Sequence, residues 1–183
     1  MGLDMYLSKK TYVKNWDFMK PEDLHTVSVL RNNEPVPYIQ PHRVSYIVES
    51  VMYWRKANQI HRWFVENVQH GEDDCGEYHV EIEQLQSLVD DCKKVIESLE
   101  NSKKGKKEAV VGWKGGEEIK EEIEVYDNTD VADELLPTTS GFFFGSTEYD
   151  EWYMNDLKNT VKELSGVLQE DNSKSSFYYS SSW

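Results

Sequence analysis

Apolar residues recur every three or four positions between residues 82 and 99, and this spacing restricts the possible folds more than any other feature of the chain. The repeating residues are Ile82, Leu85, Val89, Cys92, Ile96 and Leu99. Residues with this spacing share one face of an α-helix, so the sequence predicts an amphipathic helix here. Such a helix must pack its apolar face against another element, so the chain must supply further helices or a sheet.

Two more helices are predicted from the same kind of periodicity. The first covers about residues 51–68 and carries Ala57, Ile60, Phe64 and Val68 at helical spacing, although residues 43–54 are also rich in strand-forming types. The second covers about residues 147–168, and its apolar positions are Tyr149, Tyr153, Leu157, Leu164 and Leu168. Thr147 followed three positions later by Asp150 resembles a capping box, which predicts that this helix begins at Thr147.

Three segments are predicted to be strands. Residues 3–13 alternate apolar and polar types, residues 78–82 ("YHVEI") are predicted to be a short strand, and residues 175–183 place Phe177 and Tyr179 on the opposite face to Tyr178. Together with the helices, they predict a single α+β domain over residues 1–183, with three main helices on a small, mostly antiparallel sheet.

Residues 19–41 are punctuated by prolines and are predicted to be mainly loop, with one short strand near residues 26–30. Residues 103–134 form a strongly charged segment around the pair Gly115-Gly116. Val110-Val111 and residues 123–125 could pair as an exposed hairpin across these glycines. We therefore expect residues 103–134 to be a surface insertion outside the core.

The net charge of −14 argues against a nucleic-acid or membrane partner, because the field of the chain repels polyanions and anionic lipids. The two cysteines, Cys75 and Cys92, form no CxxC pair, and Cys92 lies on the apolar helix face. This use of cysteine fits a reducing cytoplasm. The first residues carry no signal-peptide pattern, and no apolar stretch has the length of a membrane span.

The first candidate ligand site lies in the segment "WRKANQIH", residues 54–61. If this segment is helical, Trp54, Asn58 and His61 share one face, and Arg55 and Lys56 add two cations. An indole, an amide, an imidazole and two cations can stack a ring and bind a phosphate or carboxylate. Amphipathic packing, with His61 hydrogen-bonded at the edge of the core, explains the same residues without a ligand.

The second candidate site is "GFFFGSTEYDEWY", residues 141–153. Gly145 permits unusual backbone angles, and free N–H groups at the start of the following helix could bind an anion. If "GFFF" is extended, Phe143 faces away from Phe142 and Phe144, so one set of rings would fill the core and the other would face a ligand. A core strand followed by an ordinary helix cap is the alternative. The candidate ligand-binding residues of this motif are Phe143, Phe144, Gly145, Ser146, Thr147, Tyr149 and Tyr153.

No metal site and no cofactor are predicted. His70, Asp73, Asp74, Cys75 and His79 cluster in the sequence but match no standard zinc spacing, and the acidic residues 127–133 lack the glycine and final glutamate of a calcium loop. The chain contains no phosphate-loop, dinucleotide-binding, zinc-protease or serine-hydrolase motif.

Five segments of the chain together resemble a family of small proteins encoded by phages and prophages. They are "MGLDMYL", "WRKANQIHRWF", "DDCGEY", "LLPTTSGFFFGSTEYDEWY" and "FYYSSSW", and the resemblance extends over nearly the whole chain. Relative to that pattern, residues 103–133 resemble a variable insertion. No activity is established for the family, so the resemblance supplies no catalytic residues, but it implies a phage-type accessory protein in the host cytoplasm. Such proteins often counter host defence.

Three functions follow as hypotheses. In the first, the chain binds a phosphorylated, nucleotide-like small molecule without catalysis and sequesters a host immune signal. In the second, it is a hydrolase of a phosphoester or glycosidic bond that uses His61 as general acid or base. In the third, its acidic surface binds and inhibits a host defence protein. The sequence leaves open whether the chain forms a homo-oligomer.

Overall fold

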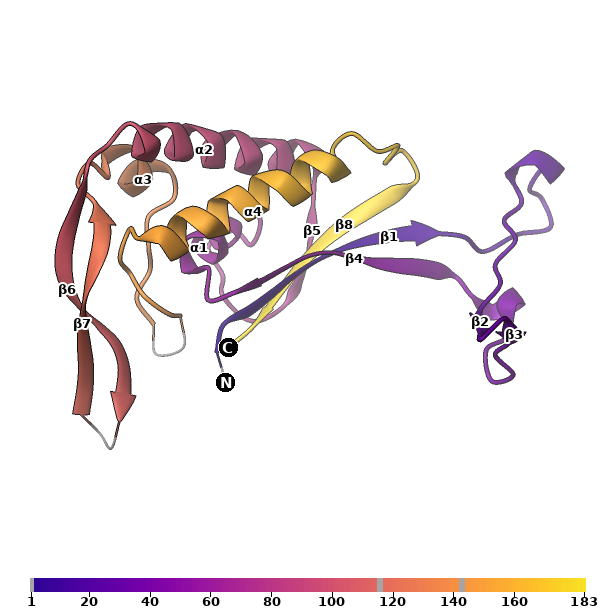
Figure 1. The fold of residues 1–183 in the computed structure, drawn as a ribbon. Helices are drawn as coiled ribbons and strands as arrows, with labels where there is room; N and C mark the ends of the chain where they lie inside the picture. Colours follow the sequence, from indigo (N-terminus) through magenta and orange to yellow (C-terminus); the bar gives the residue numbers. More distant parts are fainter. Residues whose placement is uncertain (1, 115–116, 142–143) are drawn as a thin grey trace.

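The computed structural model describes residues 2–114, 117–141 and 144–183. It is an α+β fold, which confirms the predicted class (Figure 1). The central sheet is fully antiparallel, with strand order β4-β1-β8-β5. Its strands are β1 (Asp4–Tyr12), β4 (Tyr46–Arg55), β5 (Glu77–Val80) and β8 (Ser175–Ser182).

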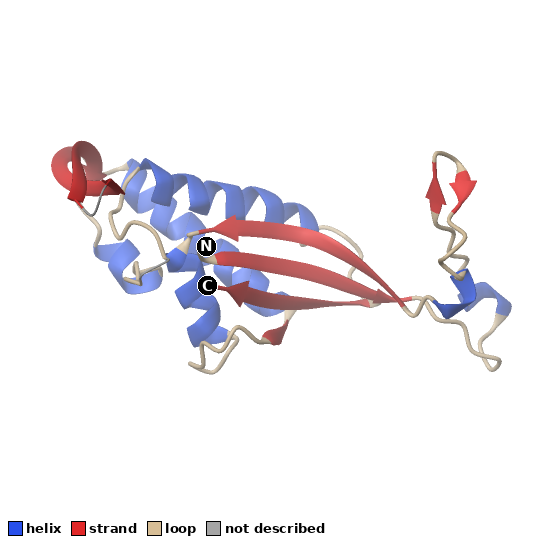
Figure 2. Cartoon of the chain, turned by 90° about the horizontal axis from the view of Figure 1, so that it is seen from below, coloured by secondary structure: helices blue, strands red, loops and turns tan. Residues whose placement is uncertain are grey.

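The described helices are α1 (Asn58–Asn67), α2 (Ile82–Glu100), α3 (Asp130–Leu135) and α4 (Glu151–Val167). The long helices α2 and α4 pack against each other and cover one face of the sheet, while the other face is open (Figures 1 and 2). On β1, Met5 and Leu7 are buried on the covered face, whereas Tyr6 is exposed on the open face. The alternation predicted for this strand is therefore confirmed.

Helix α2 matches its prediction closely, because its signals are local. Leu85, Val89, Cys92 and Leu99 are buried, and burial raises the pKa of the Cys92 thiol far above its ordinary value. The helix begins with a capping box, in which the Gln84 side chain accepts a hydrogen bond from the backbone N–H of Glu81.

Strand β8 also follows the predicted alternation. Phe177 and Tyr179 are buried, and the Tyr179 ring stacks on Phe64 of α1 with centroids 3.9 Å apart. This stack joins the sheet to α1 and contributes to the centre of the core.

The predicted helix over residues 51–68 is wrong in its first part. Residues 46–55 form β4, and α1 begins only at Asn58. Trp54 pairs with Met5 across the β1–β4 ladder, and the backbone then turns at Lys56, which has a φ of 61°. Pairing with a strand that is distant in the sequence thus outweighs the local helical spacing, so Trp54 does not share a helix face with Asn58 and His61.

The predicted start of the last helix is also wrong. Helix α4 begins at Glu151, and Asp150 is its N-cap, with Oδ1 accepting hydrogen bonds from the backbone N–H groups of Trp152 (2.9 Å) and Tyr153 (3.0 Å). Asp150 forms a β-bridge with Val125, which keeps it extended. Thr147 therefore lies in a loop ahead of the helix.

Two peripheral segments extend from this body. Strands β6 (Lys104–Lys114) and β7 (Glu117–Tyr126) form a two-stranded hairpin at one end. Its register pairs Val110 with Lys120, and not with residues 123–125 as predicted. The hairpin is exposed over most of its described length, but the predicted insertion is not wholly peripheral, because α3 packs on α2 and buries Ala132.

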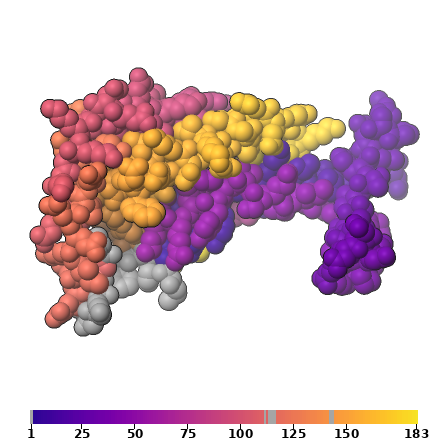
Figure 3. All heavy atoms as spheres, in the orientation of Figure 1, coloured from indigo at the N-terminus to yellow at the C-terminus, as the bar shows by residue number. Residues whose placement is uncertain are grey.

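At the opposite end, residues 14–44 protrude from the β1–β4 hairpin and are called the arm here (Figures 1 and 3). The arm contains two short 3-10 helices, Pro21–Asp23 and Pro41–Arg43, and the two-residue strands β2 (Leu30–Arg31) and β3 (Glu34–Pro35). This confirms the loop-rich prediction, but the strand expected near residues 26–30 is wrong over residues 26–29, which form no strand, and the paired strands lie at residues 30–31 and 34–35 instead. In the arm, which is described throughout, Val36 is the single buried hydrophobic residue.

Candidate ligand-binding site

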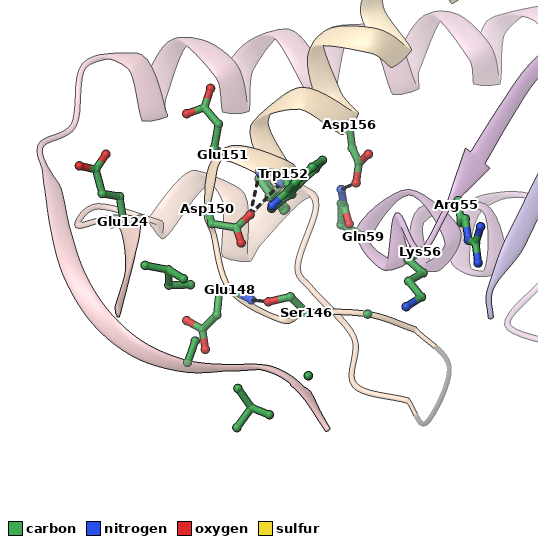
Figure 4. Close-up of a pocket in the computed structure, with 16 residues that line it drawn as sticks. Arg55, Lys56, Gln59, Glu124, Ser146, Glu148, Asp150, Glu151, Trp152 and Asp156 are labelled. Atoms are coloured by element: carbon green, nitrogen blue, oxygen red, sulfur yellow. Dashed lines mark hydrogen bonds between the residues drawn. The ribbon is translucent and has the colours of Figure 1, made fainter. Parts of the chain in front are cut away.

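A cavity of about 690 Å³ lies between the β4–α1 junction, the β6–β7 hairpin, the loop before α4 and the first turns of α4 (Figure 4). Segments far apart in the sequence form its walls. The lining residues are Arg55, Lys56, Gln59, Ala109, Val110, Gly112, Ile123, Glu124, Gly145, Ser146, Glu148, Asp150, Glu151, Trp152, Tyr153 and Asp156.

Opposite charges line opposite sides of this cavity. Arg55 and Lys56 lie on the side of β4 and α1, and Glu124, Glu148 and Glu151 lie on the other side (Figure 4). Within the described part of the chain, neither Arg55 nor Lys56 makes an ion pair. The cavity therefore presents two cations whose charge no described carboxylate of the protein neutralises directly.

The carboxylates of the opposite wall are largely compensated. Lys107 binds Glu148 at 2.7 Å, and Lys104 binds Glu151 at 3.0 Å and lies 3.8 Å from Glu124. Asp150 is occupied as the cap of α4. The predicted anion site at the start of α4 is therefore already filled by a protein carboxylate, so an anion would be attracted to the side of Arg55 and Lys56 instead.

The loop before α4 approaches the β4–α1 junction very closely. Gly145 has a φ of 90°, and a Cβ built on it would lie 3.0 Å from the Cβ of Lys56 and 3.3 Å from its carbonyl oxygen. Lys56 itself has a positive φ, which residues other than glycine rarely adopt. Its backbone N–H donates a hydrogen bond to the carbonyl of Leu3 at 2.8 Å. The glycine is thus needed for close packing at the edge of the cavity.

Asn58 holds this loop in place. Its side chain is 1% exposed, and Nδ2 donates to the carbonyls of Phe144 (3.0 Å) and Ser146 (2.8 Å). Its Oδ1 accepts from the N–H of Thr139 at 2.8 Å. The amide predicted to contact a ligand thus positions the backbone that carries Gly145 and Ser146.

His61 is buried and is not among the residues that line the cavity. Nδ1 is 2.8 Å from the Tyr179 hydroxyl and Nε2 is 3.0 Å from Asp73 Oδ2, while Asp73 Oδ1 accepts from the indole N–H of Trp183 at 3.0 Å. Burial, with the nearby charge of Asp73, raises the pKa of Tyr179 well above its ordinary value. Both nitrogens of His61 contact protein groups, so this arrangement offers neither nitrogen to a substrate.

The remaining predicted site residues divide between core, cavity edge and loop. Trp54 is buried and donates its indole N–H to Thr160 Oγ1 at 2.8 Å. Tyr153 reaches the cavity wall, but its hydroxyl donates to the carbonyl of Leu136 at 2.9 Å, and burial raises its pKa. Phe144 is half-buried, with its ring perpendicular to the His61 ring at 5.3 Å.

Thr147 and Tyr149 are not among the cavity-lining residues. The carbonyl of Thr147 accepts from Thr138 Oγ1 at 3.0 Å, and the Tyr149 hydroxyl donates to Asp133. Phe143 lies outside the described residues, so the predicted division of the phenylalanines between core and ligand is left as a prediction. Of the twelve predicted site residues, the structure brings Arg55, Lys56, Gly145, Ser146 and Tyr153 to one cavity.

Seven polar or aromatic cavity residues were not named as candidates by the sequence analysis: Gln59, Glu124, Glu148, Asp150, Glu151, Trp152 and Asp156. Three of them make up the part of the wall beside the start of α1. Gln59 follows Asn58 at the start of α1, and its Nε2 donates to Asp156 Oδ2 at 3.1 Å. Burial, with a smaller contribution from the charge of Asp150, raises the pKa of Asp156 to about 6. Trp152 is 79% exposed at the first turn of α4. Gln59 and Trp152 lie inside the two segments predicted as sites, residues 54–61 and 141–153, although neither was named as a candidate, whereas Asp156 lies outside both.

The fold and cavity define a small α+β protein with an open cavity of about 690 Å³. No protein-family model matches the chain, and neither the curated proteins nor the solved structures yielded a significant match. Among residues 2–114, 117–141 and 144–183, no group of three or more His, Cys, Asp or Glu side chains is arranged to hold a metal ion. None of the helices described is both long and apolar enough to cross a membrane.

Proposed function

We propose that this protein binds a phosphorylated, nucleotide-like small molecule in the cavity between the β4–α1 junction, the β6–β7 hairpin and α4, without catalysing a reaction. The observation that carries the proposal is the pair Arg55 and Lys56, two cations at the cavity without an ion-pair partner in the described part of the chain. Charge-assisted hydrogen bonds from such groups to a phosphate are stronger than those between neutral groups.

The shape of the cavity supports this ligand class. Its volume of about 690 Å³ falls within the range of small-molecule sites, roughly 300–1,000 Å³. Ala109, Val110 and Ile123 supply apolar surface from the hairpin, and the exposed indole of Trp152 offers a stacking platform for a base.

Backbone strain at the cation pair also supports a binding role. Lys56 is held at a φ of 61°, in a region that costs a non-glycine residue roughly 1–3 kcal/mol. Such strain persists where the surrounding structure enforces it, and it is concentrated at binding and catalytic sites. Here, Asn58 and Gly145 enforce it from either side of the junction.

The engagement of both nitrogens of His61 supports binding rather than catalysis, since a general acid or base must reach its substrate. The resemblance to phage and prophage proteins supports a further step, in which the bound molecule is a nucleotide signal of host immunity and the protein sequesters it in the host cytoplasm.

Calorimetric titration of the full chain with mono-, di- and cyclic nucleotides tests the proposed binding. Arg55→Ala should weaken binding by roughly 10- to 100-fold, the effect of about 1.5–3 kcal/mol for a lost charge-assisted hydrogen bond. The matched control is Arg62→Ala, because Arg62 is paired with Glu66 outside the cavity and its loss should leave affinity unchanged. Denaturation should release the ligand intact. Recovery of an altered nucleotide would indicate an enzyme, and the lack of binding by any nucleotide would refute the proposal.

Binding of a partner protein is a second candidate function, favoured by the surface of the arm and of the adjoining strand ends. Nine of the exposed large hydrophobic residues lie between residues 12 and 48: Tyr12, Trp16, Phe18, Leu24, Leu30, Tyr38, Tyr46, Ile47 and Val48. The effect of salt on the affinity of such a complex distinguishes binding through the apolar arm from binding through the acidic surface. A complex with a purified host defence protein made by the acidic surface weakens as salt rises, whereas one made by the apolar arm does not.

A further inference from the structure

Gln59 and Asp156 form a hydrogen-bonded pair at the cavity (Figure 4). Gln59 is only 2% exposed, so its amide is held by the surrounding protein, and Asp156 lies across from it on α4. The bond of 3.1 Å between Nε2 and Oδ2 fixes the orientation of both groups. The cavity thus contains a preorganised polar pair on two rigid helices, separate from Arg55 and Lys56.

The pair has unused hydrogen-bonding capacity. An ionised carboxylate can accept about four hydrogen bonds, and Gln59 supplies one of them to Asp156. The amide nitrogen of Gln59 carries a second hydrogen, which can donate to a ligand. Two acceptor positions on Asp156 and the second N–H of Gln59 together suit a ligand group that offers two neighbouring N–H donors beside one acceptor.

Building on the proposed nucleotide binding, we propose that the Gln59–Asp156 pair selects a guanine base. Guanine presents adjacent donors on N1 and on its 2-amino group beside the O6 acceptor, which matches the free positions of Asp156 and Gln59. Adenine and cytosine each present one exocyclic amine next to a ring acceptor, and that acceptor would face the carboxylate. Uracil presents a single N–H between two carbonyls, which fits the carboxylate no better.

The other residues of the cavity are placed so that they can contact the remaining parts of a nucleotide whose guanine is bound to Gln59 and Asp156. Trp152 lies beside the Gln59–Asp156 pair, whereas Arg55 and Lys56 lie on the other side of it (Figure 4). A guanine bound to the pair can stack on the indole while its phosphate reaches the cations. The base and the phosphate are then recognised by different residues, so their contributions can be measured separately.

The test is calorimetric titration of the full chain at pH 8 with guanosine, inosine and adenosine 5′-monophosphates and with ribose 5-phosphate. The guanine nucleotide should bind roughly 10- to 100-fold more tightly than the other two, the usual effect of a bidentate contact to a base. Inosine monophosphate differs from it only by the 2-amino group, so this comparison needs no variant of the protein.

Variants then assign the preference to the pair. Asp156→Asn should remove the preference for guanine and leave the affinity for ribose 5-phosphate unchanged, and thermal unfolding checks that the variant is folded. Glu163→Gln is the matched control, since it removes the same charge from α4 outside the cavity and should preserve the preference. Arg55→Ala should weaken all four ligands by a similar factor.

Equal binding of the three nucleotides by the native protein would overturn the guanine proposal while leaving the proposed nucleotide binding intact. Retention of the preference in Asp156→Asn would also overturn it, because another group would then read the base. If neither the nucleotides nor ribose 5-phosphate bind, the proposed function itself fails, and the guanine proposal fails with it.

Discussion

At the scale of single residues, the candidate site combines groups that face the cavity with groups that hold them in place. Asn58 was predicted to contact a ligand because of its sequence position beside two cations. Its amide instead joins α1 to three backbone groups of the loop at residues 139–146. Sequence alone cannot separate the two roles, because both need a polar side chain at the same position.

We expect Asn58→Ala to destabilise the fold by about 2–4 kcal/mol, because three buried hydrogen bonds are lost and their backbone partners are left unsatisfied. Chemical denaturation measures this change. Asn67→Ala is the control, since the Asn67 side chain makes a single bond, to the carbonyl of Trp63, among the described residues and should cost about 1 kcal/mol or less. Equal losses in the two variants would contradict the anchoring role.

Asp156 gives a prediction about pH. Its pKa is raised from 3.8 to about 6, so between these values the folded protein binds more protons than the unfolded chain, and this group makes stability fall as pH rises. At pH 8 its ionised carboxylate therefore costs stability, by about 1–3 kcal/mol. Asp156→Asn should be more stable than the native protein at pH 8 and differ little from it at pH 4. A variant destabilised at pH 8 would show that the charge is favourable in the fold.

At the scale of the elements, the sequence predicts well those helices and strands whose conformation is set by a local periodic pattern. Helix α2 and strand β8 were predicted correctly, since their periodicity is strong and their packing agrees with it. Residues 51–55, the last part of strand β4, were predicted as helix because the conformation of this strand depends on pairing with β1, a contact between distant segments. Gln59, Trp152 and Asp156 were missed for a similar reason, since the cavity exists only once α1, α4 and the hairpin are assembled.

The close approach of the loop to the β4–α1 junction predicts a strong requirement for Gly145. Gly145→Ala should destabilise the fold by roughly 1–3 kcal/mol, because its φ of 90° and the 3.0 Å approach to Lys56 both oppose a side chain. Gly166→Ala is the opposite case, since Gly166 lies in α4 with nothing described within 4 Å of an added Cβ. It should stabilise the protein by about 0.5–1 kcal/mol, as measured by denaturant unfolding. Similar effects of the two variants would contradict the close packing at Gly145.

The hairpin should contribute to the cavity more than to stability. Lys106 pairs with Glu124, so residues 107–123 can be replaced by an Asn-Gly turn that retains the pairing at the base. The shortened protein should unfold within a few degrees of the native one but bind nucleotide at least 10-fold more weakly. It lacks the apolar surface of Ala109, Val110 and Ile123, and the loss of Lys107 leaves Glu148 without its ion-pair partner in the cavity. Undiminished binding would show that the hairpin is not a wall of the site.

At the scale of the whole molecule, charge and apolar surface are segregated. The net charge is −14, yet residues 14–44 contain four basic residues (Lys14, Lys20, Arg31, Arg43) and four acidic residues (Asp17, Glu22, Asp23, Glu34) and so contribute none of it. The excess negative charge therefore lies outside residues 14–44, whereas many of the exposed aromatic residues lie in and around the arm. A partner protein and a small ligand could therefore bind at opposite ends of the molecule without competing (Figures 1 and 3).

This segregation predicts that the arm can be removed without loss of the fold or the cavity. The backbone N–H of Val13 donates to the carbonyl of Ser45 at 3.0 Å, so the β1–β4 ladder is already closed at the base of the arm, and a two-residue Asn-Gly turn can replace residues 14–44. Because Val36 is the single buried hydrophobic residue removed with this fully described segment, the free energy of unfolding should change by no more than about 1–2 kcal/mol. Nucleotide affinity should be unchanged, whereas any complex made through the arm should be lost. Unfolding of the shortened chain would show that the arm is part of the core, and weaker nucleotide binding would show that the two ends of the molecule are coupled.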